Sequence, residues 1–252
     1  MKVSVLIPTY NRAHFLKRCL ESVFNQTHKD LEILVYDDGS TDNTKEVLKT
    51  FTDPRMRWAS GRVNLGDAGA RNVLLDMATG KYSAWQDVDD MSNIYRVEMQ
   101  LAAMLDHKAP LCRCAGVPLT DDNHDDINKP PVLRPTMNRV TPATMFHTAK
   151  GKTTRYREDI YLGSDIIWEM QMTRDHGAGI SLPWKLYHVD HEPEDRLTFQ
   201  YKNNMPVYKK GMEVKNRERK RLTWELRSEG IPRWPIKVED SYTQEIFKRI
   251  CK

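Results

Sequence analysis

Residues 82–93 have the sequence YSAWQDVDDMSN, a short apolar run that ends in three carboxylates. Carboxylates gathered directly after a buried strand repel one another unless a cation or hydrogen-bond donors offset their charge. Because side chains alternate along a strand, Asp87 and Asp89 are expected to point the same way, toward a divalent ion and a diphosphate bound through it. The alternative is a solvated turn or a helix N-cap, since Asp is common in both.

The chain before this stretch alternates short apolar runs with segments of helical periodicity. Residues 3–7 (VSVLI) and 31–36 (LEILVY) are typical of strands buried on both faces. Apolar residues recur at helical spacing over residues 15–24 and 44–51, and Asn11 is expected to cap the first of these helices. Strands and helices in alternation predict an α/β protein with a mostly parallel sheet and helices packed on its faces.

Polar clusters follow three of the predicted strands, at residues 8–12, 36–40 and 86–90. Such sheets bind ligands at the carboxyl ends of their strands, so each cluster is expected to form one side of a single crevice. The first strand is followed by neither a P-loop motif nor a Gly-x-Gly-x-x-Gly motif, which argues against a P-loop enzyme and a nicotinamide dehydrogenase. Asp37 and Asp38 suit hydrogen-bond donors instead, such as a ribose hydroxyl or the N–H of a base.

Residues 64–72 (NLGDAGARN) lie between the second and third clusters and are expected to begin a helix. Asp67 is a candidate N-cap of this helix, and Gly80 is a candidate terminator. Arg71, in the first turns, is expected to pair with phosphate or with one of the carboxylates, unless it is an ordinary surface residue.

Composition and charge indicate a globular protein with one unusual region. Apolar residues make up 39% of the 252 residues, and no apolar run is long enough for a transmembrane segment or a secretory signal, so a cytoplasmic protein with free cysteines is expected. Residues 201–252 contain 14 Lys and Arg against 7 Asp and Glu, whereas residues 1–200 contain 25 against 28. This basic tail indicates an anionic partner such as nucleic acid, a membrane surface or an acidic protein, or else a solvated helical face.

Four segments, in this order, resemble the family 2 glycosyltransferases of the GT-A fold. They are VLIPTYNR at residues 5–12, EILVYDDGSTD at residues 32–42, Asn64-x-Gly66 with Ala70-Arg71-Asn72, and DVDD at residues 87–90. The resemblance is close over residues 1–95 and looser over residues 160–200. It implies a Rossmann-like, nucleotide-binding mixed sheet flanked by helices, here with a basic helical C-terminal extension. It also implies an inverting enzyme that uses a nucleoside-diphosphate sugar.

The resemblance further implies roles for individual residues. Those expected on the donor side are Pro8, Thr9, Tyr10, Arg12, Asp37, Asp38, Arg71 and Asp87. Among them, Thr9 and Tyr10 would line the base and ribose. Asp89 and Asp90 would hold Mn²⁺ or Mg²⁺ against the diphosphate. His191, or alternatively His188, would complete the metal shell or contact the diphosphate, with a purely structural histidine as the other reading.

Transfer of a sugar also requires a base that takes the proton of the acceptor hydroxyl. Asp165 precedes an apolar helical run and resembles the acidic turn before the family's acceptor-side helix, so it is the first candidate. Glu158 and Asp159 are rival candidates. Alternatively, Asp165 only complements the positive end of its helix.

We therefore predict a metal-dependent, inverting glycosyltransferase with a uridine-based donor. Residues 1–105 would be the nucleotide-sugar-binding half and residues 106–200 the acceptor-binding half of one domain, followed by the basic, mainly helical tail at residues 201–252. The acceptor hypothesis is a hydroxylated base in DNA, held through the tail; the alternative is a glycan or lipid. A nucleotidyltransferase and a non-catalytic nucleic-acid-binding module are the other functions weighed.

Overall fold

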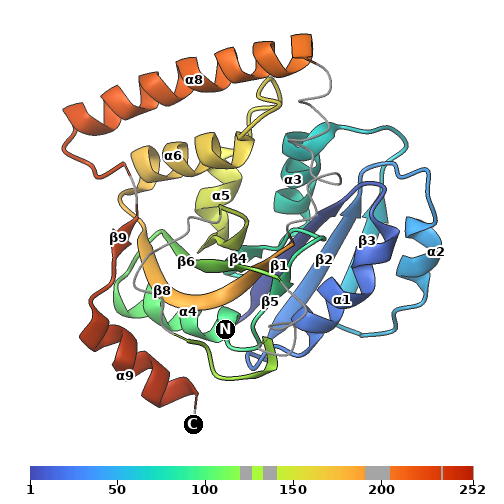
Figure 1. Cartoon of the computed structure of the whole chain (residues 1–252), viewed down its shortest axis with the longest axis horizontal. Coiled ribbons are helices and arrows are strands. Elements are labelled where there is room, and N and C mark those ends of the chain that lie inside the picture. The colour runs from blue at the N-terminus through green and yellow to red at the C-terminus, as the bar shows by residue number, and fades with distance from the viewer. Residues whose placement is uncertain (120–126, 133–140, 191–204, 234, 252) are drawn as a thin grey trace.

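The computed structural model describes residues 1–119, 127–132, 141–190, 205–233 and 235–251 of the chain. Within these ranges nine strands form one mixed sheet, in the order β3-β2-β1-β4-β7-β6-β8-β5, with β9 paired to β8 (Figure 1). The strands are β1 Val3–Thr9, β2 Leu31–Asp37, β3 Met56–Ser60, β4 Tyr82–Trp85, β5 Met91–Ser92, β6 Leu111–Pro118, β7 Met145–His147, β8 Ile180–Val189 and β9 Ile236–Lys237.

The first four strands of the sheet are parallel, as their alternation with helices predicts. β1 pairs in parallel with both β2 and β4, and β2 pairs in parallel with β3. β7 then enters antiparallel between β4 and β6, while β6 and β8 run parallel to each other. The two halves that the sequence analysis divides at residue 105 thus contribute strands to the same sheet. The second proposed boundary, at residue 200, lies outside the described residues.

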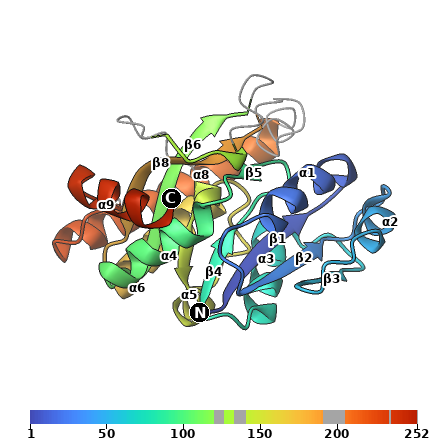
Figure 2. The same cartoon turned by 90° about the horizontal axis from the view of Figure 1, so that it is seen from below.

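Helices cover both faces of this sheet. They are α1 Ala13–Phe24, α2 Thr44–Lys49, α3 Gly66–Met77, α4 Arg96–Asp106, α5 Thr148–Thr154, α6 Ser164–His176, α8 Met205–Ser228 and α9 Asp240–Ile250, with a 3₁₀ turn at Thr141–Ala143. Alternate residues of β1 belong to opposite apolar clusters. Val5 packs with residues of α1 and α4 on the face turned to the viewer in Figure 2, and Leu6 packs with residues of α3 and α6 on the other face.

Helix α8 packs on another helix, α6. Its Leu222 and Leu226 are buried against Ile167 and Met170 of α6, and in Figure 1 it runs along the outer side of α6. Among the described residues, no helix combines the length and the apolar character needed to cross a membrane.

The predicted N-caps are wrong: Arg12 and not Asn11 is at the N-cap of α1, and Leu65 is at the N-cap of α3, with Asp67 in the first turn of that helix. Asn11 lies in a left-handed conformation (φ 52°), and its side-chain oxygen accepts hydrogen bonds from the backbone N–H groups of Thr41 and Asp42. Asp42, distant in sequence, accepts from the N–H of Ala13 at the start of α1 (3.1 Å). A short-range pattern could not identify this cap because its partner comes from the loop after β2.

Candidate functional site

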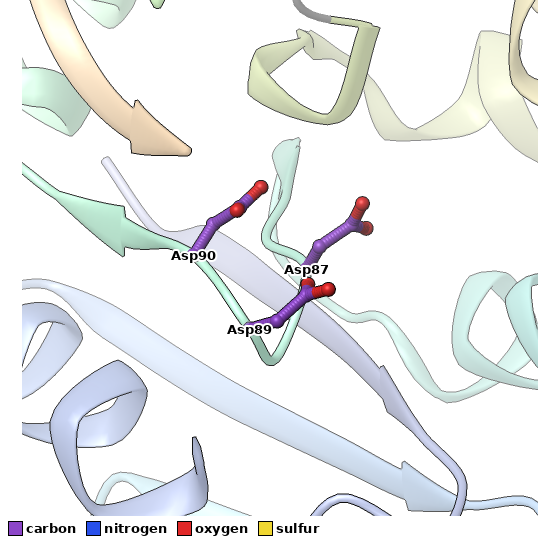
Figure 3. A group of neighbouring side chains, drawn as sticks. All are labelled: Asp87, Asp89 and Asp90. Atoms are coloured by element: carbon purple, nitrogen blue, oxygen red, sulfur yellow. The ribbon is translucent and has the colours of Figure 1, made fainter. Parts of the chain in front are cut away.

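Three carboxylates converge on the turn that links β4 to β5. β4 ends at Trp85, and the N–H of Asp90 donates to the carbonyl oxygen of Asp87 (3.2 Å), which closes the turn. Asp87, Asp89 and Asp90 each offer a carboxylate oxygen within 4.8 Å of the others, and the three side chains extend to the same side of the turn (Figure 3). The convergence therefore arises from the turn and includes Asp90, whereas strand alternation predicts it only for Asp87 and Asp89.

The charge of this group is only partly offset by the protein. Burial and the neighbouring carboxylate of Asp89 raise the pKa of Asp87 to about 6, although Arg71 opposes the shift. Burial, Asp89 and Asp87 raise the pKa of Asp90 well above its usual value, against hydrogen bonds from the backbone of Asp190 and from Tyr187. Clustered carboxylate oxygens that favour protonation fit a hard divalent cation, which would restore their ionised form.

Arg71 lies beside the group and contacts two carboxylates. It donates from Nη2 to Asp87 (2.8 Å) and from Nε to Asp67 (2.8 Å). Its guanidinium also lies over the rings of Trp85 and Tyr156, 4.9 and 5.8 Å from their centroids. Of the two partners expected for Arg71, phosphate or carboxylate, the structure shows the carboxylates.

The same ion pairs connect the carboxylate group to helix α6. The second oxygen of Asp67 accepts a hydrogen bond from the hydroxyl of Ser164 (2.8 Å), the first residue of α6. The next residue, Asp165, is half-buried in the first turn of that helix. Asp87, Arg71, Asp67 and Ser164 thus form a continuous chain of polar contacts that ends next to Asp165.

The rival base candidates lie in more constrained surroundings. Asp159 is exposed and paired with Arg157 through two contacts of 3.0 and 2.6 Å, and hydrogen bonds from Arg157 lower the pKa of its carboxyl group. Glu158 is also exposed and accepts a hydrogen bond from the side chain of Asn72 (3.0 Å). Asp165 has no ion-pair partner within the described ranges.

Asp37 and Asp38 are buried and hold the loops at the ends of β2 and β3. Asp37 accepts from the N–H of Ser40 and from the hydroxyl of Ser60, at 2.9 and 2.8 Å. Asp38 accepts from the N–H groups that begin α3, those of Leu65 and Gly66, both at 2.9 Å. Burial raises the pKa of Asp38 despite these bonds. Because a carboxylate has about four acceptor positions and Asp37 and Asp38 each accept two hydrogen bonds, each retains capacity for about two further donors.

The end of β1 places the remaining donor-side candidates beside these carboxylates. Thr9 pairs in register with Asp37, and its carbonyl oxygen accepts from the N–H of Asp38 (2.8 Å). The Thr9 hydroxyl is buried and has no hydrogen-bond partner in the part of the chain that the structure describes. Pro8 is the penultimate residue of β1. Tyr10 is the first residue after this strand, and 41% of its surface is exposed. Arg12 donates to the carbonyl oxygen of Asn11 (3.3 Å).

Sequence reasoning missed three residues around the carboxylate group. The hydroxyl of Tyr187, on β8, accepts the N–H of Asp87 (2.9 Å). Arg18 donates to the carbonyl oxygen of Asp89 (2.9 Å) and pairs with Asp190, whose own N–H donates to Asp90 (3.0 Å). Tyr187 and Asp190 lie in the segment at residues 186–191, which was singled out above only for its histidines. Arg18 lies on α1, and no sequence motif marks it.

The histidines of that segment differ in what the structure describes. His188 is buried on β8, in register with Met91 of β5. His191 lies outside the described residues, so its role at a metal stays a prediction.

The comparisons with known proteins agree with this geometry. A family model described as "Glycosyl transferase family 2" matches residues 4–162. Over 103 residues, the chain is 39% identical to the Escherichia coli protein WfgD, named UDP-Glc:alpha-D-GlcNAc-diphosphoundecaprenol beta-1,3-glucosyltransferase; the match covers 41% of each protein. The chain thus corresponds to less than half the length of that relative.

Two solved structures share the fold. S. aureus TarS (residues 1–349) in complex with UDP-GlcNAc superposes with a TM-score of 0.67 at 19% identity, covering 99% of this chain and 71% of that one. The mannosyltransferase PcManGT from Pyrobaculum calidifontis, in complex with GDP-Man and Mn²⁺, superposes with a TM-score of 0.58 at 16% identity, covering 89% of this chain and 71% of that one. The predicted GT-A architecture is confirmed.

Proposed function

This chain belongs to glycosyl transferase family 2, and we propose that it moves a sugar from a nucleoside-diphosphate sugar to an acceptor hydroxyl with inversion at the anomeric carbon. One observation carries the proposal. Asp87, Asp89 and Asp90 converge at the carboxyl edge of the parallel strands, where the raised pKa values of Asp87 and Asp90 favour a bound cation. Membership of the family argues against a nucleotidyltransferase and against a non-catalytic nucleic-acid-binding module.

The donor would lie along the ends of β1, β2 and β4. We propose that the base and ribose contact Thr9, Tyr10 and the loops held by Asp37 and Asp38, since the Thr9 hydroxyl is buried there without a partner among the described residues. A uridine-based donor is supported by the names of the similar proteins, because WfgD is named for UDP-Glc and TarS is described with UDP-GlcNAc.

The carboxylate group would hold Mn²⁺ or Mg²⁺ through Asp89 and Asp90, with Asp87 beside them and Arg71 fixing its orientation. A divalent ion bound there would neutralise the charge that develops on the leaving diphosphate. PcManGT, which has the same fold, is described with Mn²⁺.

Asp165 would serve as the base. In a single displacement the acceptor oxygen forms a bond to the anomeric carbon, the bond from that carbon to the diphosphate breaks, and the hydroxyl proton passes to the Asp165 carboxylate. Two observations support Asp165 over Asp159: it has no ion-pair partner among the described residues, and its helix is tied to Asp87 through Ser164 and Asp67.

For the acceptor we favour a glycan or a lipid-linked sugar over a hydroxylated base in DNA. WfgD, similar over 41% of the chain, is named for an acceptor that is a sugar on a lipid diphosphate. The basic tail is the only feature that motivated the DNA hypothesis, and it suits other anionic partners equally.

The experiment is a panel of nucleotide sugars in a thermal-shift assay with and without Mn²⁺, followed by measurement of sugar transfer. We expect a UDP-sugar to raise the melting temperature, more so with Mn²⁺. Asp89→Ala should abolish the Mn²⁺-dependent part of the shift and lower transfer at least about 100-fold. Asp76→Ala, an exposed change at the far end of α3, is the matched control and should leave both unchanged.

Full activity of Asp89→Ala would contradict the assignment of the carboxylate group. Transfer to hydroxymethylated duplex DNA, with none to a diphosphate-lipid-linked sugar, would reverse the choice of acceptor while leaving the donor site intact.

A further inference from the structure

Helix α8 divides into a buried face and a basic outward face. Gly211, Glu218, Leu222 and Leu226 are buried and recur at helical spacing, which marks the side that packs toward α6. The opposite side has its residues at alternating spacings of three and four. This outward face consists of Lys210, Glu213, Arg217, Lys220, Trp224 and Arg227, with Lys209 adjoining it, all exposed.

The charges of the outward face are mostly uncompensated. Together with the adjoining Lys209 it has five basic residues against one acidic residue, Glu213. Lys209, Lys210, Lys220 and Arg227 have no ion-pair partner within the described part of the chain. By contrast, Arg221, on the flank of the helix, is paired with Glu218 and Glu225 (3.0 and 2.6 Å).

One large aromatic side chain interrupts this basic surface. Trp224 is 71% exposed, the highest exposure among the large apolar side chains that the structure describes. Lys220 and Arg227 flank it one helical turn away on either side. An exposed indole between cations is costly in water but suits the interface of a bilayer, where the ring lies at the headgroup level and the cations contact anionic lipid.

The other side of α8 contacts the segment that leads into the proposed acceptor site. Glu218 pairs with Arg157 (2.7 Å), and a Cβ added at Gly163 would lie 2.6 Å from Cε of Lys215, so the Lys215 side chain lies against the Gly163 backbone. Gly163 immediately precedes Ser164 and Asp165. A surface bound by α8 would therefore be coupled mechanically to the loop and helix that carry Asp165.

We propose that the outward face of α8 binds the surface of an anionic lipid bilayer, with Trp224 inserted at the headgroup level and the flanking basic residues contacting lipid phosphates. The chemistry of the face favours this partner over nucleic acid, because an exposed indole flanked by cations suits the headgroup level of a bilayer. The proposal deepens the proposed function by placing the chain beside a lipid-linked acceptor. The observations that support lipid binding come from helix α8 and do not depend on the donor site.

The test is sedimentation of the 252-residue chain with vesicles of phosphatidylcholine containing phosphatidylglycerol, without donor or metal. We expect binding that weakens as salt rises and is absent on pure phosphatidylcholine. Lys220→Gln combined with Arg227→Gln should weaken binding about 25-fold, at about fivefold for each basic residue. Lys45→Gln combined with Lys49→Gln, the same charge change on α2, should leave binding unchanged.

The variant Trp224→Ala distinguishes insertion of the indole into the bilayer from electrostatic attraction between the basic residues and the lipid phosphates. We expect weaker binding at low and at high salt, because the indole contribution does not depend on counterions. Circular dichroism melts should show that every variant is folded. Equal binding of the wild type and the charge variant, or binding to duplex DNA without binding to anionic vesicles, would overturn the proposal. Since no donor is present, either result would leave the glycosyltransferase proposal intact.

Discussion

Glu32 provides the sharpest test of how this sequence stabilises the sheet that carries the site. It lies on β2 opposite Ser4 of β1 and is buried. Its Oε1 atom accepts hydrogen bonds from the Ser4 hydroxyl and from the N–H groups of Thr79 (2.5 Å) and Gly80 (2.9 Å). These bonds connect two strands to the turn that begins β4, the strand that leads to Asp87.

The other carboxylate oxygen, Oε2, faces cationic groups. Arg57 donates to it at 3.0 Å, and the Lys2 ammonium lies 3.6 Å away. Burial alone would raise the pKa of Glu32, but the hydrogen bonds from Ser4, Thr79 and Gly80 lower it from an ordinary 4.5 to about 2. The folded state therefore favours the ionised carboxylate much more than the unfolded chain does.

We predict that Glu32→Gln lowers the free energy of unfolding by about 2 kcal/mol at pH 7. The difference in pKa between the folded and unfolded states corresponds to about 3 kcal/mol at about 1.4 kcal/mol per pKa unit. Solvent screens the charges of the exposed Lys2 and Arg57 side chains, so we reduce this free energy to about 2 kcal/mol. The amide keeps an acceptor for the Oε1 partners but presents its NH₂ group to the cations. Urea denaturation at fixed pH measures the difference, with exposed Glu21→Gln as the matched control.

The contribution of Glu32 to the free energy of unfolding should depend on pH. Because the pKa is lower in the folded state, the unfolded state binds more protons in acid, and the Glu32 contribution is complete above about pH 5. It falls as the pH drops through 4.5 toward 2, so the gap between wild type and Glu32→Gln should shrink by more than half between about pH 6 and pH 3. A gap that stays constant over this range would refute the assignment of the stabilisation to the ionised carboxylate.

Three further predictions concern the site and its support. Asp165→Asn should lower the turnover number by about 10²–10⁴-fold while the donor dissociation constant, measured by calorimetry, stays unchanged; retained turnover would move the base elsewhere. Asp67→Asn and Ser164→Ala should each lower kcat/KM and, because the two side chains share a hydrogen bond, their double-mutant cycle should show coupling of about 0.5–3 kcal/mol; strictly additive effects would mean that the contact does not position α6. Gly151→Ala should lower the free energy of unfolding by about 1–3 kcal/mol, because the new Cβ would lie 2.3 Å from the buried ring of Phe146; an unchanged urea midpoint would contradict the close packing there.

Local sequence patterns predicted the first strands and helices of the fold well. The apolar runs at residues 3–7 and 31–36 form β1 and β2 because each is flanked by turn residues and followed by helical periodicity. The carboxylates at the ends of β2 and β4 were likewise identifiable, since their distance along the chain from a buried strand places them at one edge of the sheet. The same logic failed for Asn11, whose partners lie about 30 residues away.

The surroundings of the carboxylate group were decided only by the tertiary structure. Tyr187 lies on β8 and Asp190 directly follows that strand, each about 100 residues after its partner, Asp87 or Asp90. Arg18 lies on α1, about 70 residues before Asp89. No short-range spacing relates these positions, because their proximity depends on β8 pairing with β5 and on α1 packing against the same edge.

Residues 82–93 thus show which properties of the site the sequence determines and which depend on the tertiary structure. The sequence alone determined that an apolar strand is followed closely by Asp87, Asp89 and Asp90, because the three residues lie within four positions of the chain. The turn that brings their oxygens within 4.8 Å, and the burial that raises the pKa values of Asp87 and Asp90, exist only once β4, β5 and β8 are assembled. Desolvation and long-range pairing are properties of the packed chain, and this is the physical reason that the sequence could indicate the site but not its electrostatics.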